Sequence, residues 1–423
     1  MAEPVIAPHD TNGRRPIRFA ALQVPLFRRY WVASWISSTG DGMENVIRGL
    51  LVVQLVGLAA APFWLGMMVF AHWVPFTLFS LYGGALADRY DNRKVQIAAQ
   101  LLLMTAAFGV AAATLAGIVT VWWIFGLLLI HGFAGAIGGP AQQTLIHSIV
   151  GRDRLLSAVS LNSTARQLSQ VVGPAVAGFI YLQFGPGWGL FVNGLTFVPL
   201  LIFLTFFMRL APKAKLAPQA VLASLREGIA FVRARPRLGG LIGVEMLPVI
   251  FLGHTFSSLL VVFATDYLHA GTLGYSFLLV SSGIGALGAG LYLAYARERR
   301  DPAPIIVGGA VVEMVAIFLF ALTTSYGLAL LLMLAIGAAT VLTQSFNNTA
   351  LQLAAPDHLR GRVMGAYSFG TQGLRVVNGP LLGVLATVLT PPIAVAGSAL
   401  AVVAGLGAIV VAVPQLLRRR DVD

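Results

Sequence analysis

The sequence predicts an all-α integral membrane protein, with twelve transmembrane helices arranged as two pseudo-symmetric six-helix bundles. Of the 423 residues, 57% are hydrophobic and only 10% are charged, whereas soluble proteins carry about 25% charged residues. The apolar runs are about 20 residues long, as helices that cross a bilayer require, whereas barrel strands take about 10 residues of alternating character. The third observation is the placement of the basic residues, which repeats along the chain.

Apolar runs long enough to span the membrane occur twelve times. They lie at residues 31–56, 64–87, 95–117, 120–147, 157–182, 187–208, 238–264, 272–296, 303–323, 326–348, 363–388 and 392–414. The first 29 residues are polar and basic and lack the apolar segment of a cleavable signal peptide, so we expect the first span to direct insertion. The absence of cysteine excludes disulfides and thiol chemistry.

The basic residues alternate between loops. Twenty-five of the 28 lysines and arginines precede the first span, occupy every second loop or follow the last span, and the intervening loops carry none. The positive-inside rule then predicts an even number of spans in the cell (inner) membrane, with both termini in the cytoplasm. The net charge of +12 therefore reports topology, and we expect no nucleic acid partner.

The chain divides at its longest connection between spans. Apolar residues recur there at helical spacing opposite charged residues, which predicts an amphipathic helix on the cytoplasmic surface. Residues 143–178 resemble residues 348–383, and repeated halves indicate a substrate path between them near the bilayer midplane. The expected parts are a cytoplasmic tail, an N-terminal bundle, a linker, a C-terminal bundle and a second cytoplasmic tail, at residues 1–30, 31–208, 209–237, 238–414 and 415–423.

A compact charged motif, "GGALADRYDNRK", interrupts the apolar sequence at residues 83–94. It resembles the motif between the second and third spans of the major facilitator superfamily, through Gly84, Asp88, Arg89, Arg93 and Lys94. Asp91 stands where that family usually has glycine, and Asn92 is inserted before the basic pair. With "FRRYWVASWISSTGD" before it and "LRGRVMGAYS" in the second half, the chain is similar to the drug:proton antiporter subgroup that includes macrolide-efflux and enterobactin-export proteins. The resemblance implies that superfamily's fold and a transport function.

The charged motif has two interpretations. Asp88 at the end of a helix is disfavoured by the helix dipole, so we expect it to bind Arg93 or, as the resemblance implies, the start of the eleventh span near Arg362. In the first interpretation the motif is a cytoplasmic latch between the two halves, formed by Gly84, Asp88, Arg89 and Arg93. In the second it is a charge cluster that only solubilises the loop and determines topology.

Three ionisable residues lie within the first span. Asp41, Glu44 and Arg48 in "GDGMENVIRG" are spaced i, i+3 and i+7, so they share one stripe of a helix near the midplane. Ionised groups in lipid cost at least ~2.5 kcal/mol each, so we expect them to face a wet cavity or one another. Glu44 and Arg48 can pair, which leaves Asp41 as the freer carboxylate. The cluster is either a proton-coupling or substrate-binding site or a self-neutralised structural unit.

Arg166 and Arg375 occupy corresponding spans, the fifth and the eleventh. They are candidates for binding an anionic substrate or for pairing with Glu245 in the seventh span or Glu313 in the ninth. Glu313 is the weaker site candidate because ninth spans of the resembled fold usually pack at the periphery.

His131 and His254 are candidate proton relays, or hydrogen-bonded structural residues. Two Gly-Pro pairs in the fifth and eleventh spans predict helix breaks that free backbone carbonyls, or plain kinks for packing. These pairs are Gly173, Pro174, Gly379 and Pro380. The resembled family associates G-P-x-x-G-G in the fifth span with antiporters, and Ala177 replaces one of its glycines here.

Catalytic motifs are absent from the sequence: it has no metal-ligand spacing, nucleophile elbow or nucleotide-binding loop, so we expect no enzyme activity, cofactor or metal. The predicted function is secondary active transport by alternating access, with proton-coupled export of a hydrophobic or amphipathic, drug-like small molecule. The alternatives are a lysolipid flippase, a siderophore exporter, or a transport-inactive membrane sensor or scaffold. The expected partners are a small-molecule substrate, protons and the lipid bilayer, with the protein a monomer.

Overall fold

The computed structural model describes residues 20–151, 153–208, 221–295, 303–356 and 359–416. Throughout these residues the regular structure is helical, with no strand. This follows from the membrane environment, in which a helix satisfies all its backbone hydrogen bonds internally.

The first half of the chain folds into long helices that belong to six spans. The elements are η1 (Ala20–Gln23), α1 (Pro25–Arg89), α2 (Asn92–Leu115), α3 (Val121–Val150), α4 (Leu155–Thr196), α5 (Val198–Ile202) and the π-helical η2 (Phe203–Phe207). α1 and α4 each contain two spans, because the backbone leaves helical geometry at Gly57 (φ 75°) and at Gly185 (φ 80°). Glycine is the residue that adopts such positive φ values without strain.

The second half has more interruptions. Its elements are α6 (Val221–Arg233), α7 (Pro236–Phe251), α8 (Gly253–Val262), the π-helical η3 (Phe263–Tyr267), α9 (Gly271–Tyr295), α10 (Ala303–Leu322), α11 (Tyr326–Ala354), α12 (Arg360–Gly373), α13 (Arg375–Val388), α14 (Pro391–Ala412) and η4 (Pro414–Leu416). The seventh span is α7, α8 and η3, broken at Leu252, and the eleventh is α12 and α13, broken at Leu374.

The twelve predicted spans are all present. Nine helical stretches among the described residues are long and apolar enough to cross a membrane. Two of these stretches, 25–80 and 157–207, contain two spans each, and the α12–α13 pair completes the set. The predicted fold of two six-helix bundles is confirmed.

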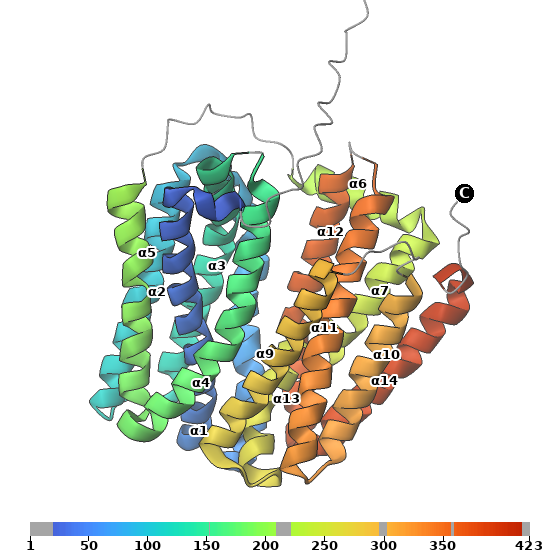
Figure 1. The fold of residues 1–423 in the computed structure, drawn as a ribbon. Helices are drawn as coiled ribbons and strands as arrows, with labels where there is room; N and C mark the ends of the chain where they lie inside the picture. Colours follow the sequence, from blue (N-terminus) through green and yellow to red (C-terminus); the bar gives the residue numbers. More distant parts are fainter. Residues whose placement is uncertain (1–19, 152, 209–220, 296–302, 357–358, 417–423) are drawn as a thin grey trace, which may run out of the picture.

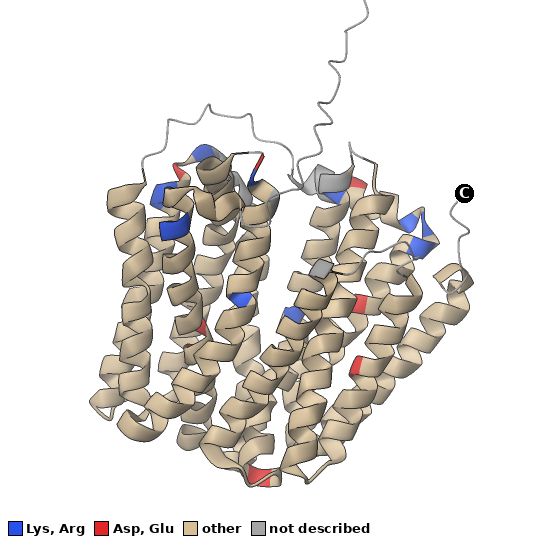
Figure 2. Cartoon of the chain, in the orientation of Figure 1, with Lys and Arg blue, Asp and Glu red and all other residues tan. Residues whose placement is uncertain are grey.

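The two bundles stand side by side, with α1–α5 in one and α7–α14 in the other (Figure 1). α6 lies across the end of the second bundle, on the face where the described C-terminal helix η4 also lies. We refer to this face as the α6 face and to the other end of the bundles as the opposite face. Lysines and arginines gather toward the α6 face (Figure 2), as the alternation of basic loops predicts.

The bundles make their closest backbone contacts in the half nearer the opposite face. A Cβ on Gly66, in the second span, would lie 2.3 Å from the carbonyl oxygen of Gly379 and 2.7 Å from Cα of Gly383, both in α13. A Cβ on Gly178 of α4 would lie 2.4 Å from Oγ of Ser276 in α9. Small residues at these points let helices of opposite bundles touch, so this end is sealed by backbone packing.

The Gly-Pro pairs do not break their helices, as one of the two interpretations of the sequence predicted. α4 runs through Gly173 and Pro174 and leaves helical geometry only at Gly185, and Pro380 lies inside α13. A Cβ on Gly173 would lie 2.8 Å from the carbonyl oxygen of Thr39, and one on Gly379 would lie 2.3 Å from that of Gly66. These glycines are therefore points of close helix approach, and the break in the eleventh span falls at Leu374 instead.

Replacing Gly66 with alanine should open the seal, because the added methyl group has no room against α13. The native chain has no cysteine, so spin labels can be attached to cysteines at Leu58 and Leu389, both exposed near the opposite face. Pulsed electron spin resonance should then show a larger population of long distances in Gly66→Ala. Gly126→Ala is the matched control, since a Cβ there meets no atom within 4 Å. Identical distance distributions in both variants would contradict this assignment of the seal.

Candidate functional site

A cavity of about 660 Å³ lies between the bundles. Residues from both halves line it. The described acidic, basic and histidine residues of the lining, called its ionisable groups below, are Asp41, Arg48, His72, His131, Glu245, His254, Glu313 and Arg375. Most of its other lining residues are apolar or carry an amide or a hydroxyl group. The eight ionisable groups therefore meet in one chamber inside the membrane, which is where a substrate path between the halves is expected.

Glu44 is the most fully bonded carboxylate of the first bundle. Its side chain is 1% exposed, and Arg48 Nη1 donates to its Oε1 at 2.9 Å, as the i, i+4 spacing predicts. Asn193 Nδ2, from the sixth span, donates to Oε2 at 2.9 Å. His131 Nδ1, from α3, lies 3.6 Å from Oε1, and Arg48 Nη2 also donates to Asn45 Oδ1 at 2.5 Å. Glu44 thus ties three spans together, which suits a structural role.

Asp41 lies one turn before Glu44 and lines the same cavity. Its Oδ1 is buried and has no hydrogen-bond partner among the residues that the structure describes. A buried carboxylate oxygen without a donor is costly as an anion. Asp41 is therefore the carboxylate of this cluster that is free to exchange a proton or to bind a substrate donor.

The second bundle holds its own bonded carboxylate, Glu245 of α7. It accepts hydrogen bonds from Asn347 Nδ2 at 2.6 Å and from the Tyr367 hydroxyl at 2.5 Å. Asn347 Nδ2 also donates to the carbonyl oxygen of Leu241 at 3.2 Å. Glu245 thus has neutral donors from α11 and α12, and the described contacts include no ion pair between it and Arg375.

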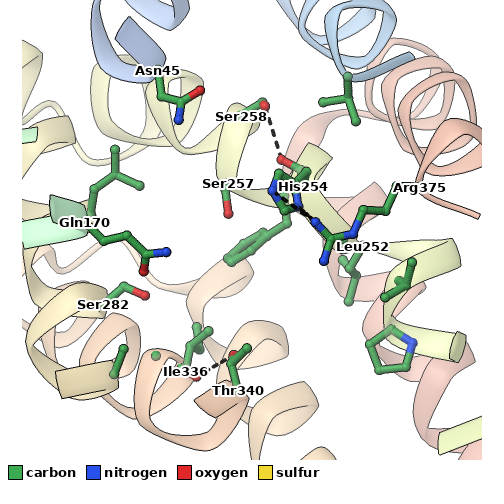
Figure 3. A pocket seen from close by; sticks show the side chains of 18 of the residues that line it. Asn45, Gln170, Leu252, His254, Ser257, Ser258, Ser282, Ile336, Thr340 and Arg375 are labelled. Atoms are coloured by element: carbon green, nitrogen blue, oxygen red, sulfur yellow. Dashed lines mark hydrogen bonds between the residues drawn. The ribbon is translucent and has the colours of Figure 1, made fainter. Parts of the chain in front are cut away.

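Arg375 instead joins the two bundles through an aromatic contact. Its guanidinium lies 4.7 Å from the ring centroid of Trp73, in the second span, and its Nη1 lies 3.3 Å from Nδ1 of His254. The rings of Trp73 and His254 meet edge to face at 5.5 Å between centroids. Figure 3 shows His254 and Arg375 pointing toward one another at the cavity. A guanidinium over an aromatic face gains a cation–π interaction and keeps donors for an anion.

Two further predicted residues lie elsewhere than expected. Glu313, ranked as the weaker candidate because ninth spans of the resembled fold usually pack at the periphery, lines the cavity, and the Thr340 hydroxyl donates to its Oε1 at 2.7 Å. Arg166 is exposed and has no ion pair or hydrogen bond within the described ranges. It lies one turn from Gln170, which does line the cavity, so its side chain is near the chamber's margin.

Two arginines named for the latch or its expected partner, Arg93 and Arg362, have described contacts. Arg93 donates from Nε to the carbonyl oxygen of Leu204 at 2.5 Å and from Nη2 to that of Thr205 at 2.6 Å, both within its own bundle. Arg362 forms an ion pair with Glu227 of α6. Arg89 is exposed, whereas Gly84 and the side chain of Asp88 lie outside the part that the structure describes, so the latch stays a prediction.

Several contacts of the site could not be located from sequence alone. Asn193 and Trp73 are not among the residues that the sequence singled out, yet Asn193 donates to Glu44 and Trp73 contacts Arg375. Tyr367 was noted only as part of a family-like motif, and it bonds Glu245. A search for every amide, indole and phenol inside the spans, alongside the charged groups, would have found all three.

Paired six-helix bundles around a central cavity define a multi-pass membrane transporter, and solved structures share this fold. The nucleoside transporter NupG aligns with a TM-score of 0.70 and 14% identity, over 93% of this chain and 100% of that one. A POT family transporter in complex with 5-aminolevulinic acid aligns with a TM-score of 0.70 and 13% identity, over 94% of this chain and 96% of that one.

Residues 17–421 match the family described as transmembrane secretion effector, MFS_3. The chain therefore belongs to this family of major facilitator superfamily transporters, as its motifs predicted. It is 26% identical over 404 residues to the enterobactin exporter EntS of Shigella flexneri, covering 93% of this chain and 91% of that protein. The family and this relative are named as transport proteins rather than enzymes.

The different bonding of the two carboxylates predicts different effects on stability. Glu44→Gln removes the charge that Arg48 binds and should lower the free energy of unfolding by about 3 kcal/mol. Asp41→Asn removes no hydrogen bond and should change it by less than about 1 kcal/mol. Unfolding of the purified variants in a denaturing detergent, followed by tryptophan fluorescence, measures both. Equal losses would contradict the division into a bonded and a free carboxylate.

Proposed function

We propose that the protein exports an amphipathic small molecule in exchange for protons, by alternating access to the cavity between its two bundles. The single observation that carries this proposal is the group of ionisable side chains around one membrane-embedded chamber lined by both halves. Such groups are retained inside membranes chiefly where water, protons or substrate reach them. The export direction is supported by the similarity to an exporter, EntS.

Orientation and access are part of the proposal. The excess of basic residues toward the α6 face supports its assignment to the cytoplasm. The close glycine contacts in the other half of the molecule support a conformation that is sealed on the outer side and open to the cytoplasm. Arg93 and Arg362 each bond to another partner here. In the outward-open state, the latch of Gly84, Asp88, Arg89 and Arg93 would bind the start of the eleventh span instead.

Asp41 is the proposed proton-coupling residue. Its cavity-facing carboxylate has an oxygen without a donor, and Glu44, Arg48 and His131 lie close by. Substrate or water that enters the cavity can change the solvation of Asp41 without breaking any hydrogen bond of the protein. Protons and substrate then compete for one group as the cavity faces each side in turn.

A siderophore-type anion is a second candidate substrate. The favouring observation is Arg375, whose Nε is buried without a partner in the described part of the chain and whose guanidinium stacks on Trp73. Aromatic rings bearing acidic hydroxyl groups could contact the indole and bind the guanidinium together. The similarity to enterobactin exporters supports this candidate over a drug-like cation at the same position.

Transport assays test the proposal directly. Purified protein is screened by thermal shift against dyes, macrolides, lysolipids and enterobactin, and the stabilising compounds are then assayed in proteoliposomes with an imposed pH gradient. The wild type should accumulate such a compound only with the gradient. Asp41→Asn should fold normally and lose at least ~10-fold in gradient-driven flux, because it removes the side chain proposed to bind and release the proton. Full flux in Asp41→Asn would reject Asp41 as the coupling residue, and flux that ignores the gradient would reject proton coupling.

A further inference from the structure

We propose that the cavity extends into a side pocket of the second bundle that binds the protonated amine of an amphipathic ligand. This inference deepens the proposed function, because it assigns a chemical class to part of the substrate site. The observation behind it is that Glu313 of α10 contacts Thr340 of α11, with Thr343 one turn further along α11, where the cavity reaches between these helices and α7. We refer to this region as the Glu313 pocket.

The Glu313 carboxylate has little compensation from the protein. Its one described hydrogen bond comes from the Thr340 hydroxyl, to Oε1. The lining residues contributed by α7, α10 and α11 include Glu245 as a second carboxylate but no lysine, arginine or histidine. Both cationic lining residues, Arg48 and Arg375, belong to the first span and to α13. The pocket therefore holds a carboxylate whose negative charge its own walls would not neutralise.

A second polar group in the pocket is also without a partner. Thr343 is 5% exposed, and its Oγ1 is buried with no hydrogen-bond partner among the described residues. A Cβ on Gly309 would lie 2.6 Å from this oxygen, so Thr343 faces α10 one turn before Glu313. Buried hydroxyl groups are normally hydrogen-bonded, so an unpartnered one beside an uncompensated carboxylate points to a ligand that donates.

The remaining walls of the Glu313 pocket are apolar and suit the hydrocarbon part of an amphipathic ligand. Met314, Ile317, Met333 and Ile336 line the pocket and are largely buried. Figure 3 shows Ile336 and Thr340 together beside the chamber that Ser257 and Ser282 also border. Methionine side chains adapt to ligands of different shape. A primary ammonium supplies positive charge and three N–H donors for Glu313 and Thr343, while its hydrocarbon part lies against these residues.

A matched pair of probes tests the proposal: 4-phenylbutylamine and 4-phenylbutan-1-ol, which differ only in the head group. Binding to the purified protein at pH 7 is measured by ligand-dependent thermal shift. The amine should bind about tenfold more tightly than the alcohol to the wild type, as a charge-assisted hydrogen bond implies. In Glu313→Gln this preference should fall to about one, and in Thr343→Val the amine affinity alone should weaken by about 3-fold.

Asp266→Asn is the matched control, because Asp266 is an exposed carboxylate in η3 and does not line the cavity. It should keep the tenfold preference. Equal binding of the two probes to the wild type, or an undiminished amine preference in Glu313→Gln, would overturn the proposal. Loss of the preference in Asp41→Asn but not in Glu313→Gln would also overturn it, by moving the amine to the first bundle. The binding assay does not depend on transport. If the amine preference is absent, proton-coupled transport that depends on Asp41 can still be observed. If that transport is absent, amine binding can still be measured.

Discussion

An ionised side chain inside a bilayer needs a partner or water, and this constraint explains how the protein is built. The chain places Asp41, Glu44 and Arg48 on one stripe of its first span, at a depth where contact with lipid would be unfavourable. In the folded protein, Asn193 donates a hydrogen bond to Glu44, His131 lies close to the same carboxylate, and a cavity lies beside Asp41. All of these residues belong to the first bundle, and the second bundle supplies the other wall of the cavity beside Asp41.

The two halves share a plan but differ in their chemistry. Each has a buried glutamate in its first span, Glu44 or Glu245, that accepts a hydrogen bond from an asparagine. In the first half the glutamate also pairs with Arg48, whereas in the second Arg375 bonds His254 and stacks on Trp73. The pseudo-symmetry of the fold therefore carries an asymmetric site, with a bonded ion pair on one side and an accessible guanidinium on the other. In the proposed mechanism, protons bind in the first half and substrate in the second, on two sides of one cavity.

Sequence patterns predicted the features of the structure that depend on residues close together in the chain. The Glu44–Arg48 pair follows from i, i+4 spacing, and the span count follows from run length and basic loops. Asn193 and Tyr367 could not be assigned, because their partners lie 149 and 122 residues away and only tertiary packing brings them together. A Gly-Pro pair in a sequence is compatible with a helix break or with close packing of two helices. Gly379 serves for close packing, because it lies against the backbone of Gly66. Glu313 was ranked as the weaker candidate from the usual position of ninth spans, and only its tertiary neighbours show that it lines the cavity.

In the proposed alternating-access cycle, water reaches the first-span cluster from one side of the membrane at a time. Asn45 is exposed, lines the cavity and sits between Glu44 and Arg48, and the native chain has no cysteine, so Asn45→Cys provides a single reporter. Its labelling by a membrane-impermeant maleimide can be compared in inside-out and right-side-out vesicles. The account predicts rapid labelling in inside-out vesicles and slow labelling in right-side-out ones. Rapid labelling from the outer face alone, or no labelling from either side, would contradict it.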